Sequence, residues 1–281
     1  MNTRKMIAVC LTLVLALGLP LTVLAEQYDL ANGSIEVTAK DDGQYVSQTQ
    51  NNIIDQKQTS GTVILQHGGG STQNTVTITA EENQTAEVTL SGVNIDTSNS
   101  GDAAVTTAGK GNVTIELDGS NTVKSGYVHA GVEKKNEGNL TIADEKKNGS
   151  LNAKGGEKGA GIGGGFAGDG TDITVSGGEV TATGGMYGAG IGGGKLGDGS
   201  NITVSGGEVT AKGGENGAGI GGGYQGAGSG ITIENGEVKA TGGENGAGIG
   251  GGWQGDGSSI TVKNGKVNAT GGTYGAGIGG G

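Results

Sequence analysis

GAGIGGG occupies residues 159–165, and the same seven residues return at 188–194, 217–223, 246–252 and 275–281. Each start lies 29 residues after the previous one, as 188 does after 159. A repeat of this length is typical of solenoids, in which every repeat forms one supersecondary unit and stacks on its neighbours. We therefore take residues 159–281 as regular 29-residue repeats, the last of them truncated.

Each repeat contains three short apolar clusters separated by glycine-rich segments, which in the first copy are Ala160/Ile162, Ile173/Val175 and Val180/Ala182. Apolar residues alternate with other residues inside each cluster, which is the period of a β-strand. No segment has the 3.6-residue period of a helix, and glycine costs about 1 kcal/mol at each helix position. The pattern predicts an all-β fold, a right-handed parallel β-helix with three sides and about 29 residues per coil.

Stacking of such coils places identical residues above one another. The predicted interior ladders are Ile162/Ile191/Ile220/Ile249, Ile173/Ile202/Ile231/Ile260 and Val180/Val209/Val238/Val267. Looser apolar clusters continue upstream, so we expect residues 63–158 to form irregular coils. Residues 26–62 are more polar and are expected to form an N-terminal cap or lead-in.

The first residues have the features of a secretory leader. Arg4 and Lys5 precede the apolar run 6–24, which ends in the small-residue sequence Val23-Leu24-Ala25. This predicts a signal peptide over residues 1–25 and a secreted or extracellular protein, with an uncleaved membrane anchor as the alternative. No second apolar run follows, so no membrane insertion is expected after the leader is removed.

The remaining chain is strongly acidic. Loss of Arg4 and Lys5 changes the formal net charge from −11 to −13, and the only cysteine, Cys10, leaves with the same segment. Disulfides are therefore excluded from the exported part. The negative charge argues against nucleic acid or anionic lipid as a partner and is compatible with cations or neutral polymers.

Two positions vary between repeats beside the glycine-rich turns. One holds Phe166, Lys195, Tyr224 and Trp253, and the other holds Tyr187, Asn216, Asn245 and Tyr274. Exposed aromatic rings can stack on sugar rings or on a partner protein. We expect Phe166, Tyr187, Tyr224, Trp253 and Tyr274 to bind carbohydrate. The alternative is that these rings only cover the glycine backbone of the turns.

Acidic residues also recur in register. Asp169, Asp198 and Asp256 share one position of the repeat. Like charges about 5 Å apart repel one another, so either solvent or a bound cation must compensate. Carboxylate oxygens suit Ca²⁺, and calcium held by these three aspartates is the predicted cofactor.

Catalysis has little support. His67 and His129 lie far apart in the sequence with no cluster of partner residues, whereas a general base needs an oriented setting. Lyases of similar fold commonly use an arginine base, and Arg4 is the only arginine. We expect no catalytic residues, and a polysaccharide lyase or hydrolase is the minor alternative.

A family resemblance supports a binding function. Residues 85–126, with VTLSGVNI at 88–95 and NVTIEL at 112–117, resemble a clostridial family of secreted carbohydrate-binding β-helix domains, and NLTI at 139–142 with GSL at 149–151 resembles the next coil of that family. The GAGIGGG copies resemble repeats of large surface proteins from gut Firmicutes. The resemblance implies a right-handed parallel β-helix, bound calcium and affinity for acidic plant polysaccharides.

These observations predict a non-catalytic protein that binds a polysaccharide or surface glycan. A structural spacer or adhesin stalk at the cell surface is the first alternative. Ice binding would need a second threonine column beside Thr174/Thr203/Thr232/Thr261, and the series Thr183/Lys212/Thr241/Thr270 is interrupted by the lysine. The truncated last repeat leaves a sheet edge that could pair with another copy.

Overall fold

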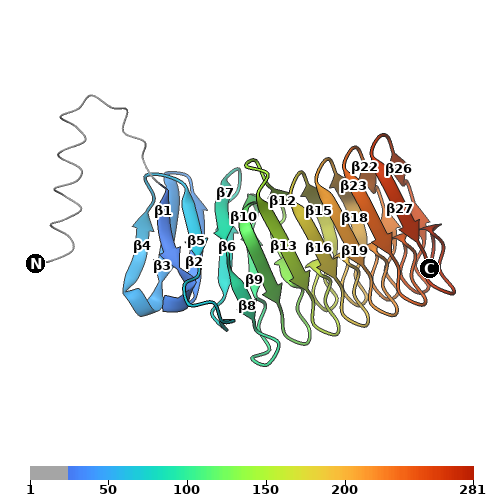
Figure 1. The fold of residues 1–281 in the computed structure, drawn as a ribbon, viewed down its shortest axis with the longest axis horizontal. Helices are drawn as coiled ribbons and strands as arrows, with labels where there is room; N and C mark the ends of the chain where they lie inside the picture. The colour runs from blue at the N-terminus through green and yellow to red at the C-terminus, as the bar shows by residue number, and fades with distance from the viewer. Residues whose placement is uncertain (1–24) are drawn as a thin grey trace, which may run out of the picture.

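The computed structural model describes residues 25–281, so the predicted signal peptide lies outside the described residues except for Ala25. Its only helices within residues 25–281 are two short 3-10 turns, η1 (Leu30–Asn32) and η2 (Thr49–Asn51). No helix in this part of the chain is long and apolar enough to cross a membrane. The strands wind into a parallel β-solenoid of about eight coils with about 29 residues per coil, stacked along the long axis (Figure 1). The predicted all-β parallel β-helix is confirmed.

Each coil passes in turn over three faces, which we name A, C and B. Face A contains β1 (Glu26–Asp29), β5 (Thr62–Leu65), β7 (Thr85–Ser91), the first part of β10 (Asn112–Lys124), β12 (Leu140–Ala143), β15 (Gly170–Val175), β18 (Gly199–Val204), β21 (Gly228–Ser229), β22 (Thr232–Ile233), β25 (Gly257–Ser258) and β26 (Thr261–Val262). Face C contains β8 (Asn94–Asp96), the second part of β10, β13 (Gly149–Lys154), β16 (Glu179–Thr183), β19 (Glu208–Lys212), β23 (Glu237–Thr241) and β27 (Lys266–Thr270).

Face B closes each coil. It contains β2 (Ile35–Lys40), β6 (Val76–Ala80), β9 (Val105–Gly109), β11 (Val132–Lys134), β14 (Ile162–Gly163), β17 (Ile191–Gly192), β20 (Ile220–Gly221), β24 (Ile249–Gly250) and β28 (Ile278–Gly279), and the antiparallel strands β3 (Gly43–Gln48) and β4 (Ile53–Lys57) extend it beyond β2. From β14 onward each strand of this face is only two residues long, so the turns on either side of it come close together.

The interior is built from the predicted ladders. Ile162 pairs with Ile191, and the series continues through Ile220 and Ile249, all with no exposed surface. Val180 likewise pairs with Val209, and that series runs on to Val238 and Val267. In the first regular coil, faces B and C each bury one β-branched residue, Ile162 and Val180, and face A buries two, Ile173 and Val175. Burial of these side chains is the apolar contribution that holds the stack together.

The glycines of the repeat are required where neighbouring coils approach most closely. Gly192 has a φ of +135°, and a Cβ atom built on it would lie 2.0 Å from the carbonyl oxygen of Gly221 in the next coil. A larger residue would clash with backbone and would also be strained by the positive φ. The GAGIGGG sequence is therefore a packing requirement of this turn.

Parallel coils begin earlier than the sequence suggests. β1 pairs with β5 and β2 pairs with β6, both in parallel, so residues 26–40 already form part of the first coil rather than a lead-in before Val63. The added strands β3 and β4 lie at the N-terminal end of the solenoid (Figure 1). Because this hairpin is inserted between β2 and β5, Glu26 pairs with Thr62, and the usual repeat length is hidden at this coil.

Candidate functional site

The two variable positions of the repeat lie at the tips of tight turns. Phe166 occupies the second position of a turn closed by the hydrogen bond from Gly168 N to Gly165 O, 2.9 Å, and the following Ala167 has a φ of +54°. Tyr187 lies in a turn closed from Gly188 N to Gly185 O, 3.0 Å. Turn tips project side chains outward. Phe166, Trp253 and Tyr274 are exposed, whereas Asn216 is buried and the other members of the two sets are partly exposed.

The short face B brings these two turns into contact. The backbone N–H of Tyr224 donates to the carbonyl of Tyr187 at 2.8 Å, and the N–H of Lys195 donates to the carbonyl of Lys158 at 2.8 Å. The two variable positions, which the sequence analysis treated as separate rows, therefore form a single surface. We name it the aromatic–lysine ridge and define it by Tyr127, Lys158, Phe166, Tyr187, Lys195, Tyr224 and Trp253.

At the centre of the ridge, the Tyr224 ring contacts two other rings. The ring centroids of Tyr187 and Tyr224 are 5.6 Å apart in an edge-to-face arrangement, and those of Tyr224 and Trp253 are 5.0 Å apart. The Lys195 ammonium lies 4.3 Å from the Tyr187 centroid and 5.4 Å from that of Tyr224. Both geometries are favourable for aromatic and cation–π attraction. The rings are tilted against each other and do not form a flat row.

A second group of the ridge repeats this chemistry toward the N-terminus. Lys158 Nζ lies 4.8 Å from the Phe166 centroid and 5.0 Å from that of Tyr127. The Tyr127 hydroxyl donates to Glu157 Oε1 at 2.9 Å, and this bond to a carboxylate raises the pKa of Tyr127. Aromatic faces and ammonium groups thus alternate along the ridge.

The ridge contains four of the five predicted carbohydrate-binding residues. Phe166 and Trp253 are 47% and 37% exposed, so both present ring surface to solvent. Tyr274 is 73% exposed and contacts no other ring among residues 25–281. Sequence reasoning did not identify the roles of Tyr127, Lys158 and Lys195. Lys195 occupies a repeat position that holds an aromatic residue in the other three copies, and this exception was the signal available in the sequence.

Two of the three predicted metal-binding aspartates accept hydrogen bonds from the backbone. Asp169 Oδ1 accepts a hydrogen bond from Asp198 N at 2.8 Å, and Asp198 Oδ1 accepts one from Ala227 N at 2.7 Å. Within residues 25–281 no group of three or more histidine, cysteine, aspartate or glutamate side chains is placed to hold a metal ion. Ca²⁺ takes six to eight oxygen ligands, and the aspartate column does not gather the carboxylates for such a site. Calcium binding stays a prediction that a titration can check.

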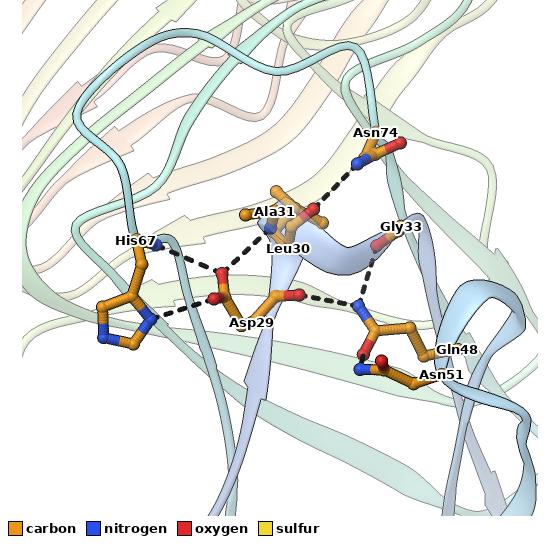
Figure 2. Close-up of polar contacts among 8 residues, drawn as sticks. All are labelled: Asp29, Leu30, Ala31, Gly33, Gln48, Asn51, His67 and Asn74. Carbon is orange, nitrogen blue, oxygen red and sulfur yellow. Dashed lines mark hydrogen bonds and ion pairs between the residues drawn. The ribbon is translucent and has the colours of Figure 1, made fainter.

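Both histidines are engaged by carboxylates. Figure 2 shows Asp29 between η1 and His67, with its Oδ2 2.9 Å from His67 Nδ1 and its Oδ1 accepting from the N–H groups of Ala31 and His67. In the same network, Gln48 donates to the carbonyls of Asp29 and Gly33. These bonds close the first coil and bind the hairpin to it. His129 pairs with Glu133, whose side chain is 3% exposed and also contacts Lys135.

The two threonine series considered for ice binding lie on different faces. Thr174 pairs with Thr203 on face A, whereas Thr183 pairs with Lys212 on face C. Together they form no flat two-column array.

Comparison with known families agrees with this architecture. The family model described as "Beta helix repeat" matches residues 147–166, 173–195, 202–224, 231–253 and 260–281. Four of the five matches end on residues of the aromatic–lysine ridge, namely Phe166, Lys195, Tyr224 and Trp253. Searches of the curated proteins and of the solved structures found no significant match. The repeat matches and the stacked parallel coils together show that the chain is a β-helix repeat protein.

Proposed function

We propose that this β-helix repeat protein is exported and binds polysaccharide or surface glycan, without catalysis, through the aromatic–lysine ridge. The observation that carries the proposal is the contact group of Tyr187, Tyr224 and Trp253 with Lys195 on the outside of the solenoid. The chain concentrates aromatic side chains here, where they contribute nothing to the buried core, although only 3% of its residues are aromatic.

The ridge has the chemistry that sugar rings need. The apolar faces of pyranose rings pack on aromatic surface, and each such contact contributes on the order of 1 kcal/mol. Lys158 and Lys195 add donors for hydroxyl or carboxylate oxygens beside the rings. Several weak contacts along one polymer would add through multivalency, which favours a long glycan over a single sugar.

A spacer or adhesin stalk is the second candidate, and one observation favours it. The lysines lie over the ring faces, so part of the aromatic surface is already occupied within the protein. In a spacer, the ridge would only shield the glycine turns from solvent, and other parts of the protein would carry out recognition. Binding measurements distinguish the two roles, because a ridge that only shields the turns should bind no glycan.

The test is a glycan array probed with residues 26–281 and with the Tyr224→Ala/Trp253→Ala variant. We expect binding to at least one polysaccharide, lowered at least tenfold in the double variant with little change in melting temperature. Tyr274→Ala is the matched control because this ring is isolated from the others, and it should bind nearly as the parent protein does. Absence of binding across the array, or full binding by the double variant, would contradict the proposal.

A further inference from the structure

The sequence contains six Asn-Gly pairs, and the fold constrains them to different degrees. They are Asn32-Gly33, Asn148-Gly149, Asn216-Gly217, Asn235-Gly236, Asn245-Gly246 and Asn264-Gly265. Asparagine loses its side-chain amide most readily before glycine, because the glycine nitrogen can attack the asparagine Cγ without hindrance from a side chain. The reaction needs a free glycine N–H and an asparagine side chain that can reach it. The structure therefore decides which of the six pairs can react.

Four of the pairs are held by hydrogen bonds. In each of them the glycine N–H is a donor, from Gly33 to Leu30 O at 3.3 Å, from Gly149 to Asp144 Oδ2 at 3.0 Å, from Gly217 to Gly214 O at 3.0 Å and from Gly246 to Gly243 O at 3.1 Å. The side-chain amide of Asn148 also donates to Asp118, at 2.8 Å. That of Asn245 donates to Asn216, at 2.9 Å. Such a pair must open locally before the glycine nitrogen can react.

The other two pairs lie at the corner between faces A and C and have no such restraints. Asn235-Gly236 connects β22 to β23, and Asn264-Gly265 connects β26 to β27 one coil further on. Both asparagines are exposed. Within residues 25–281, neither the two glycine N–H groups nor the two asparagine side chains take part in a hydrogen bond. The attacking nitrogen and the carbon that it attacks are therefore both free.

The stacking of the coils explains why glycine follows these asparagines. Gly236 has a φ of +90°, and a Cβ atom built on it would lie 2.6 Å from the carbonyl oxygen of Gly207 in the preceding coil. Gly265 has a φ of +93° and the same close approach to Gly236. Glycine is thus required at this position. The residue before it is not constrained in this way, since Gly177 and Gly206 occupy the asparagine position in the earlier coils. Asparagine at this corner therefore always completes a reactive pair.

We propose that Asn235 and Asn264 are sites of spontaneous deamidation, and that the other four pairs are protected by the fold. The glycine nitrogen gives its proton to solvent base and bonds to Cγ, the Cγ–Nδ2 bond breaks, and ammonia leaves a succinimide ring. Water then opens the ring at either carbonyl and gives aspartate or isoaspartate. Each event adds one negative charge at a corner where Lys263 already pairs with Glu234, at 2.8 Å. The inference is independent of glycan binding.

The chain contains matched controls for the test. Asn235, Asn216 and Asn245 all lie between glutamate and glycine, and Asn264 and Asn148 both lie between lysine and glycine. The folded protein is incubated at mildly alkaline pH, and conversion at each asparagine is followed by mass spectrometry of its peptides. We expect conversion at Asn235 at least tenfold faster than at Asn216 and Asn245, and at Asn264 at least tenfold faster than at Asn148. In denaturant, asparagines with the same neighbours should react at similar rates, because the hydrogen bonds are absent.

A variant provides the second measurement. Asn235→Gly/Asn264→Gly restores the Gly-Gly sequence that earlier coils have at this corner, so its melting temperature should match that of the parent protein. Isoelectric focusing should show acidic forms that accumulate with time in the parent and at least tenfold more slowly in the variant. Equal rates within either matched set in the folded protein, no conversion at Asn235 and Asn264, or equal accumulation of acidic forms in the variant would overturn the inference.

Discussion

Asp169 links its coil to the next one by accepting a hydrogen bond from the backbone N–H of Asp198, 2.8 Å away. Asp198 repeats the contact with Ala227 at 2.7 Å. Each carboxylate thus satisfies a backbone donor at a turn that has no strand partner there. These two like charges are tolerated in one column because Asp169 and Asp198 each bind the coil that follows.

The first prediction concerns this link. Asp198→Ala removes the acceptor for the Ala227 N–H and should lower the melting temperature by roughly 2–4 °C. Asp256→Ala is the control, since the Asp256 carboxylate makes no hydrogen bond within residues 25–281, and it should change the melting temperature by less than about 1 °C. Equal effects in thermal melts of the two variants would show that the hydrogen bond is not the cause.

Calcium titration tests the second role considered for these aspartates. If the column binds Ca²⁺ as the sequence predicts, the melting temperature should be higher in CaCl₂ than in NaCl at equal ionic strength, and Asp198→Asn should lose this rise. Equal melting temperatures in the two salts would contradict a calcium site and leave Asp169 and Asp198 with their backbone hydrogen bonds alone.

The third prediction concerns the glycine turn. Gly192→Ala would place a Cβ 2.0 Å from Gly221 O and should destabilise the protein by roughly 3 kcal/mol or more. Gly92 also has a positive φ, +67°, but a Cβ atom built there meets nothing within 4 Å, so Gly92→Ala tests a left-handed backbone position without a clash between coils. Denaturant unfolding of the two variants should differ clearly. Similar losses would mean that the coils can separate to accommodate the methyl group.

The fourth prediction concerns the pH dependence of the first coil. Burial raises the pKa of Asp29, but hydrogen bonds from Ala31 N–H and from His67 outweigh it, and the carboxyl pKa lies below its ordinary value. A depressed pKa contributes stability at pH above the unfolded value of about 3.9, and this contribution is lost as the pH falls through the folded value.

Hydrogen exchange of residues 30–40 is the measurement for Asp29. Protection should decrease in the parent protein as the pH is lowered through and below about 4, after correction for intrinsic rates. Asp29→Asn should show lower protection at neutral pH and little further loss on acidification. The same acid-induced loss in both proteins would assign the effect to other carboxyl groups.

The sequence was sufficient for the parts of the fold that repeat. Ile162 and Ile191 could be placed on one ladder because stacked coils align identical residues. The pairing of Glu26 with Thr62 could not be predicted, since the inserted hairpin has no counterpart in later coils. Lys195 could not be placed between Tyr187 and Tyr224, because the contact depends on the two-residue length of β17, which brings the flanking turns together.

The ridge can be observed directly because Trp253 is the only tryptophan of the chain. Its ring lies 5.0 Å from that of Tyr224 and is 37% exposed, so a sugar ring stacked there would change its emission. Titration of residues 26–281 with the polysaccharide selected by the glycan array should give a saturable change in tryptophan fluorescence, with the midpoint that affinity electrophoresis gives for the same polymer. Saturable binding of that polymer with unchanged Trp253 emission would contradict the assignment of the ridge as the glycan site.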